Sequence, residues 1–101
     1  MRVIWANSAL LDLDAIQSYY RDEVGNPHAA ARVIGAIVTA GDTLDVFPLR
    51  GRLLPDATYA FPIVVYPQYR LVYDVNEGGG VVEIVHVETT LTATPRPAAG
   101  K

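Results

Sequence analysis

The chain carries few residues that could transfer a proton, and His86 is the most noticeable of them. It lies in the stretch VVEIVHVETT (81–90), two positions before Glu88. Histidine changes charge near neutral pH, so it can act as a general acid or base when a neighbouring group orients it. A lone histidine in a strand is also a common structural residue. The stretch is therefore either the edge of a catalytic site or a strand that contains a histidine.

Arginine supplies nearly all the positive charge. Seven of the eight basic residues are arginine, and the only lysine is Lys101. A guanidinium binds carboxylates and phosphates through two parallel hydrogen bonds, whereas lysine offers a mobile point charge. Arg50, Arg52 and Arg70 fall within 21 residues of one another. These three are the candidate anion-binding residues.

The composition excludes several kinds of site. The chain has no cysteine, so disulfides and thiolate metal sites are excluded. His28 follows Pro27 in the first turn of a predicted helix, where we expect a solvated surface side chain. No metal-ligand spacing links His28 to His86, so the sequence predicts neither a metal nor a cofactor.

Length and charge narrow the class of protein. The chain has 101 residues, enough for one domain with its own core. Its net charge of −3 argues against direct nucleic-acid binding, which needs clustered cations. No apolar run is long enough to span a membrane, and residues 1–6 are too mixed for a signal peptide. We therefore expect a cytoplasmic protein without a membrane partner.

The first half of the chain predicts a strand and a helix hairpin. Residues 2–6 are β-branched and aromatic, which indicates a strand. A helix follows, with Ser8 as its N-cap, Asp12 and Asp14 suited to its positive end, and Gly25 at its C-terminus.

The second predicted helix begins at Asn26 as the cap with Pro27 in the first position. We expect Pro48 to end it. Gly35 and Gly41 lower its helix propensity, so we interpret them as points of close packing against a neighbouring element.

The second half predicts a loop at 49–60 and three strands. They cover 63–66, 69–75 and 81–88, with a turn at Pro67-Gln68 and a hairpin turn at NEGGG (76–80). The element order β-α-α-β-β-β predicts a two-layer α+β domain, with the helix hairpin packed on one face of a small antiparallel sheet. The domain covers residues 1–91, and 92–101 form a flexible C-terminal tail.

Alternation along the strands assigns the faces of this sheet. The residues predicted to face the helices are Tyr69, Leu71 and Tyr73. Arg70 and Val72 then lie on the open face, where Arg70 either pairs with Glu83 or contacts a partner. His86 is expected to share a face with Ile84 and Glu88.

The two arginines around Gly51 also have two interpretations. In the first, Arg52 forms an ion pair with Asp45 or Asp56 and holds the loop in place. In the second, Arg50 binds a carboxylate of a partner protein. Gly51 between them lets the backbone turn tightly.

The order of five motifs resembles the RelE/ParE superfamily of bacterial type II toxins, and its ParE branch in particular. The motifs are ALLDLDAIQSYY (9–20), NPHAAARVIGAI (26–37), LDVFPLRGR (44–52), YRLVYDV (69–75) and VEIVHV (82–87). Each motif is weak alone, but the set extends over nearly the whole chain.

The resemblance implies a small toxin that a cognate antitoxin binds and silences. ParE-type members inhibit DNA gyrase, and RelE-type members cut mRNA on the ribosome. The acidic balance favours the ParE-like function with a ParD-like antitoxin of the ribbon-helix-helix type, oligomerisation mainly through that antitoxin, and no catalytic residue. The alternatives are a RelE-like mRNA endonuclease and an inactive toxin fold that only binds the antitoxin.

The resemblance also implies which residues bind a partner, antitoxin or target. They are Arg50, Arg52, Tyr69, Arg70 and His86. The sequence departs from ParE-like chains at three charged positions. Those chains tend to have an arginine near Tyr59, an arginine in place of His86, and a histidine near Thr89.

Overall fold

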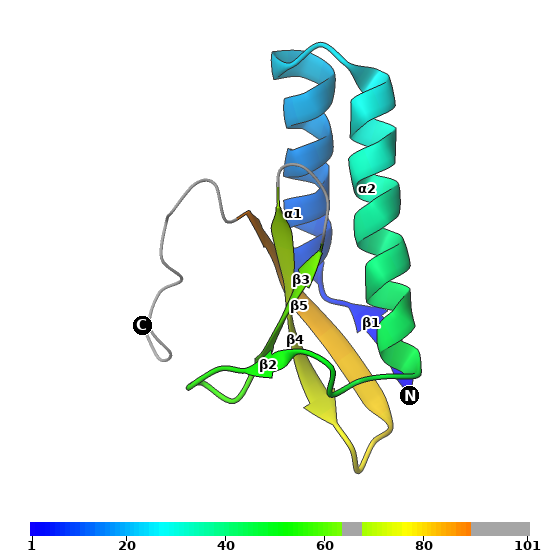
Figure 1. Cartoon of the computed structure of the whole chain (residues 1–101), viewed down its shortest axis with the longest axis vertical. Helices are drawn as coiled ribbons and strands as arrows, with labels where there is room; N and C mark the ends of the chain where they lie inside the picture. Colours follow the sequence, from blue (N-terminus) through cyan, green and yellow to red (C-terminus); the bar gives the residue numbers. More distant parts are fainter. Residues whose placement is uncertain (64–67, 90–101) are drawn as a thin grey trace.

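Two helices lie against one face of a five-stranded sheet in the computed structural model, which describes residues 1–63 and 68–89 (Figure 1). The strands are β1 (Arg2–Trp5), β2 (Arg52–Leu53), β3 (Tyr59–Ile63), β4 (Tyr69–Asn76) and β5 (Val81–Thr89). The helices are α1 (Asn7–Ser18), extended by a π-helical turn (Tyr19–Glu23), and α2 (Pro27–Asp42), extended by a 3-10 turn (Thr43–Asp45). The predicted two-layer α+β arrangement, with a helix hairpin on one face, is confirmed.

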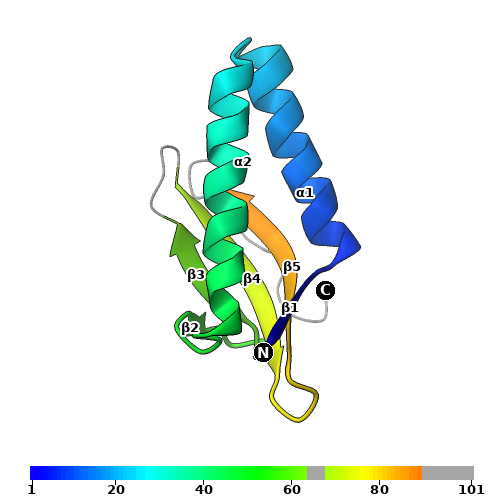
Figure 2. The ribbon, with the colours of Figure 1, turned by 90° about the vertical axis from the view of Figure 1, so that its right-hand side faces the viewer.

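The sheet is mixed, whereas the sequence predicted an antiparallel one. Its strand order is β1-β5-β4-β3-β2, and β1 pairs in parallel with β5, from Arg2 opposite Val81 to Trp5 opposite Ile84. A parallel pair requires a long crossover connection, which the helix hairpin and the intervening strands supply. The short strand β2 lies in the predicted loop and pairs with the start of β3. Both views place α1 beside β5 (Figure 1, Figure 2).

The turn between the helices follows the local sequence signals. Gly25 has a φ of +72°, a conformation that side chains other than glycine's rarely adopt. Asn26 caps α2, since its side chain accepts a hydrogen bond from the Ala29 N–H at 3.0 Å, and Pro27 opens the helix. The other ends differ from prediction. Ser8 lies inside α1 rather than capping it, and α2 ends at Asp42, well before Pro48.

The two glycines of α2 have different environments. A Cβ on Gly41 would lie 2.4 Å from Cζ2 of Trp5, so the predicted close packing is confirmed there. A Cβ on Gly35 would meet nothing within 4 Å, so the prediction is wrong at this position. Gly35 lies on the exposed side of α2, whereas Gly41 is buried where the helix packs on the Trp5 ring of β1.

The core lies between the helices and the sheet, and a bulge in β5 determines which side chains enter it. Ile37 and Leu44 are fully buried against Leu71, Tyr73 and Ile84. The pairing of β4 with β5 shifts between Val72 and Tyr73, because Val72 is opposite His86 whereas Tyr73 is opposite Ile84. Val85 is thus the extra residue of a β-bulge. The predicted common face for His86 and Ile84 is wrong for this reason.

Two predictions, the end of the second strand with its turn and the C-terminal tail, concern residues that the structure does not describe. Positions 64–67 of the predicted second strand and its turn, and the predicted tail at 92–101, lie outside the described residues. Neither helix within residues 1–63 and 68–89 has the length and hydrophobicity of a membrane-spanning segment.

Candidate functional site

Arg70 lies on the open face of the sheet, as alternation predicted, and forms an ion pair there. Its Nε and Nη2 atoms each lie 2.8 Å from Oε1 of Glu88, the residue directly opposite it on β5. The predicted intramolecular partner, Glu83, instead faces Asp74. The side chains of Arg70 and Glu88 retain 29% and 24% of their exposure, so this pair remains accessible to a partner.

His86 is joined to the first helix by Asp12. Its Nδ1 lies 3.1 Å from Oδ2 of Asp12, and the same oxygen accepts a hydrogen bond from the Val87 N–H at 2.9 Å. An ionised carboxylate only accepts hydrogen bonds, so Nδ1 is the donor of this contact and Nε2 remains as the second nitrogen. Both side chains are partly exposed. The pair therefore has the chemistry of an oriented imidazole.

The start of α1 completes the edge of β5 beyond the point where β1 ends. The Ala6 N–H donates to the Ile84 carbonyl at 2.9 Å, and the Ser8 hydroxyl donates to the Val85 carbonyl. Asp12 continues this series one helical turn later. The sequence interpretation assigned Ser8 and Asp12 to the helix terminus only. Their spacing of four residues, which places two polar groups on one helix face, was the signal for this contact.

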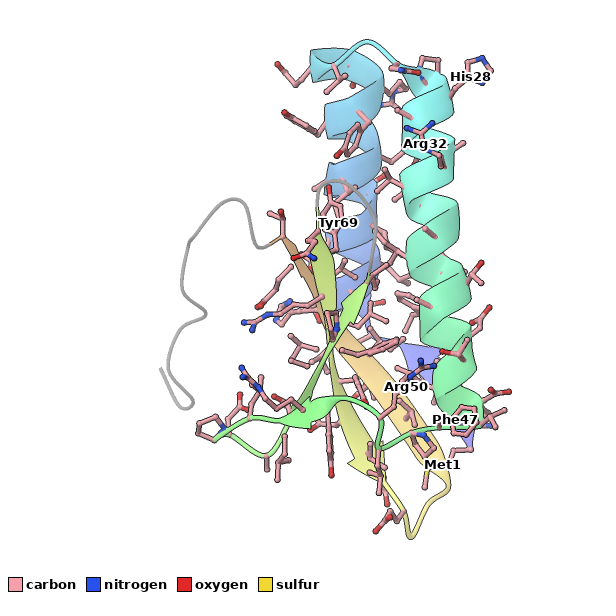
Figure 3. The ribbon with its side chains drawn as sticks, viewed as in Figure 1. Met1, His28, Arg32, Phe47, Arg50 and Tyr69 are labelled. Atoms are coloured by element: carbon pink, nitrogen blue, oxygen red, sulfur yellow. The ribbon has the colours of Figure 1, made fainter. Side chains whose placement is uncertain are left out.

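Arg50 is held at the end of α2, on the helix side of the sheet. Its guanidinium lies 4.3 Å from the centroid of the Phe61 ring, and Nη1 donates to the Thr43 hydroxyl at 3.0 Å. Phe61 is opposite Leu71, a core residue, so this position is on the face away from Arg70. Figure 3 shows Arg50 beside Phe47. No ion pair of Arg50 occurs within the described residues.

The loop around Gly51 is held by a tyrosine. The Gly51 N–H donates to the Tyr73 hydroxyl at 3.0 Å, and a Cβ on Gly51 would lie 2.7 Å from that oxygen. Burial raises the pKa of Tyr73, so the donor–acceptor pair stays neutral. Arg52, expected to pair with Asp45 or Asp56, forms no ion pair in the part of the chain that the structure describes. It is exposed and lies opposite Ala60, at the edge of the open face.

Tyr69 is in the core and not on the binding surface. Its side chain is 5% exposed, and its hydroxyl lies 3.5 Å from that of Tyr20. Burial, followed by the contact with Tyr20, raises the pKa of Tyr69. Of the five predicted binding residues, Tyr69 thus shapes the layer between α1 and the sheet, while the others keep exposed surface.

The three positions at which the resemblance implied basic residues have other partners in this structure. Tyr59 stacks on Tyr73 with ring centroids 5.4 Å apart, and the Thr89 hydroxyl donates to the Gln68 carbonyl at 3.3 Å. His86 has the Asp12 contact described above. Among the described residues, 1–63 and 68–89, no group of three or more His, Cys, Asp or Glu side chains is placed to hold a metal ion.

Comparison with known proteins identifies relatives along nearly the whole chain. A profile of the ParE toxin of the type II toxin–antitoxin system, parDE, matches residues 3–91. Toxin RelE2 of Caulobacter vibrioides is 41% identical in an alignment of 88 positions that covers 85% of this chain and 91% of that protein.

Two solved structures share the fold. A chain of the chromosomal ParDE system from P. aeruginosa superposes with a TM-score of 0.73 at 24% identity, covering 88% of this chain and 95% of that chain. A chain of the toxin–antitoxin complex RelBE2 from Mycobacterium tuberculosis superposes with a TM-score of 0.63 at 24% identity, covering 87% and 95%. At this identity the two likenesses show the fold alone.

The profile match extends from the second residue of β1 through the end of β5. It therefore covers both helices and all of the open face, including Arg70 and His86. The chain belongs to the ParE toxin family of type II toxin–antitoxin systems.

Proposed function

We propose that this protein is a toxin that acts by protein binding, as a ParE-like inhibitor of DNA gyrase, and that a ParD-like antitoxin of the ribbon-helix-helix type neutralises it. The proposed location is the cytoplasm, where gyrase acts. No bond-breaking residue and no cofactor are needed for this activity.

The charge of the open face carries the proposal. Arg70 is already bound by Glu88, and Asp74 and Glu83 stand opposite each other on the same two strands. Binding and cleaving RNA requires cations that are free to neutralise phosphates. On this face the central arginine is already paired and the neighbouring side chains are acidic. Such a face is better suited to binding a protein surface with positive and negative side chains than to binding RNA.

The outer side of α1 supports antitoxin binding. Leu11 and Tyr19 are 68% and 54% exposed and lie eight residues apart, with Ala15 between them. This spacing forms an apolar stripe along one side of the helix, which is suited to an amphipathic partner helix. We propose that the antitoxin docks on the exposed face of the helix hairpin and also reaches Arg50 and Arg70. These arginines lie on opposite faces and beside strands β3 and β4, so we propose that the segment passes round the edge formed by β2 and β3.

The direct test in cells is induced expression with and without the antitoxin encoded beside the toxin. The proposal predicts growth arrest with a DNA-damage (SOS) response, and normal growth when the antitoxin is co-expressed. Healthy cells containing folded toxin at high level, with intact antitoxin binding, would instead identify an inactive toxin fold that only binds its antitoxin.

One observation favours a second candidate, ribosome-dependent mRNA cleavage. Asp12 orients the His86 ring on an exposed part of the sheet, and such a ring can activate a 2′-hydroxyl as a general base. The relative at 41% identity is also named RelE2. The test is a translation reaction with the wild type, His86→Ala and Arg70→Ala. Cleavage that both substitutions abolish would support this candidate, and intact mRNA with the wild type removes it.

A further inference from the structure

An exposed apolar patch follows the end of α2 beside Arg50, and the proposed function uses only the arginine of this region. Val46 and Phe47 are 66% and 61% exposed, and Leu49 is half exposed. Val46 and Phe47 line a shallow hollow of about 440 Å³ together with Arg50. Contiguous apolar surface of this kind on a small protein marks a binding site for another protein.

Both signs of charge surround this patch. Asp42 and Asp45 line the same hollow as Arg50, yet none of the three forms an ion pair within residues 1–63 and 68–89. Asp42 is also the last residue of α2, where a carboxylate opposes the helix dipole, and the last turn contains no basic residue. The N-terminal ammonium of Met1 donates to the Asp45 carbonyl at 2.7 Å, so one positive charge lies near these acids. It forms no ion pair with either carboxylate in the described part of the chain, and both carboxylates therefore remain available to a cation of a partner.

Arg50 is presented in a fixed orientation. Stacking on Phe61 and the hydrogen bond to Thr43 hold its guanidinium before any partner arrives. A preorganised guanidinium loses little side-chain entropy when it binds a carboxylate.

An apolar centre with acids and an arginine around it is complementary to itself. In a two-fold symmetric dimer, the same patch of both copies forms the interface. Arg50 of each copy can then face Asp42 and Asp45 of the other copy. We propose that the free toxin forms a two-fold dimer through this patch, with Val46 and Phe47 at its centre and Arg50 of each copy paired with Asp42 and Asp45 of the other. This inference does not depend on the gyrase target, and it applies to the chain before antitoxin binds.

Charge exchange between two variants tests the pairing. Arg50→Asp alone, and Asp42→Lys with Asp45→Lys alone, should each raise the dimer dissociation constant roughly tenfold or more in sedimentation equilibrium. Mixing the two variants restores opposite charges at both pairs, so heterodimers should form with near wild-type affinity. The matched control is Arg32→Asp, which lies at the far end of α2 (Figure 3) and should leave the dimer unchanged.

The variant with Asp42→Lys and Asp45→Lys also distinguishes loss of the dimer from unfolding. A lysine at the end of α2 complements the helix dipole, so the variant should melt no lower than the wild type while it dimerises less. A wild type that stays monomeric up to high protein concentration overturns the proposal. So does a dimer that survives both single-sided reversals, or a Phe47→Asp variant that loses antitoxin affinity while self-association is unchanged.

Discussion

Oδ2 of Asp12 lies 3.1 Å from Nδ1 of His86, although the two residues are 74 positions apart in the chain. The same carboxylate oxygen accepts the backbone N–H of Val87. The contact therefore fixes the first helix on the edge of the last strand, at the point where β1 no longer covers it. It gives His86 a structural function that is independent of any reaction, and the same orientation is what a catalytic histidine would need.

Asp12→Ala should destabilise the fold. The substitution leaves the Val87 N–H and the His86 ring without their acceptor, and losing such bonds costs about 1–3 kcal/mol of the free energy of unfolding. Urea denaturation measures the change. Asp14→Ala, at an exposed position on the same helix, is the control and should stay within about 0.5 kcal/mol of the wild type. Equal losses in both variants would show that the Asp12 contact does not stabilise the protein.

The two glycines of α2 should respond in opposite directions to alanine. Gly41→Ala places a methyl group against the Trp5 ring and should lower the free energy of unfolding by about 1–3 kcal/mol. Gly35→Ala has open space around it and should raise it by about 0.5–1 kcal/mol through better helix propensity. Thermal melting of both variants checks this. A stabilised Gly41→Ala protein would contradict the packing of α2 on β1.

Alkaline pH should destabilise the protein through its buried tyrosines. Burial raises the pKa of Tyr69 and Tyr73 in the folded state, so the unfolded chain loses these protons first, near pH ~10. The contribution of these tyrosines to the free energy of unfolding is therefore fully present below that pH. It is lost as the pH rises towards their pKa in the folded state. Tyr69→Phe should reduce the fall, with the exposed Tyr19→Phe as control. An identical pH profile for Tyr69→Phe and wild type would exclude this contribution.

Arg50→Glu combined with Arg70→Glu should weaken the antitoxin complex roughly tenfold or more, because each reversal replaces an attraction with a repulsion. Isothermal titration calorimetry with the neighbouring antitoxin measures the affinity. Arg2→Glu is the matched control, since Arg2 is exposed on β1 at the opposite edge of the sheet. Unchanged affinity of the double variant would refute contact with these two arginines.

The sequence predicted those features that depend on neighbouring residues. The boundary at Gly25, Asn26 and Pro27 follows from the φ preference of glycine, a capping side chain and a proline at the first helical position, and all three are found. The open-face position of Arg70 follows from alternation in β4, which places Tyr69, Leu71 and Tyr73 in the core. Local chemistry was sufficient for these elements.

The features that the sequence did not predict depend on residues far apart in the chain. The direction of β1 is set by pairing with β5, and no periodicity within either strand encodes it. The bulge at Val85 reverses the alternation that placed His86 with Ile84. The acidic residue that pairs with Arg70 depends on the register of β4 and β5, which places Glu88 rather than Glu83 opposite the arginine.

The supercoiling activity of purified DNA gyrase, titrated with folded toxin, distinguishes a gyrase inhibitor from a nuclease. We predict that the toxin inhibits supercoiling, that an equimolar amount of antitoxin restores it, and that His86→Ala inhibits as well as the wild type. Normal supercoiling in the presence of excess toxin, together with ribosome-dependent mRNA cleavage that His86→Ala abolishes, would contradict a protein-binding toxin and establish the nuclease in its place.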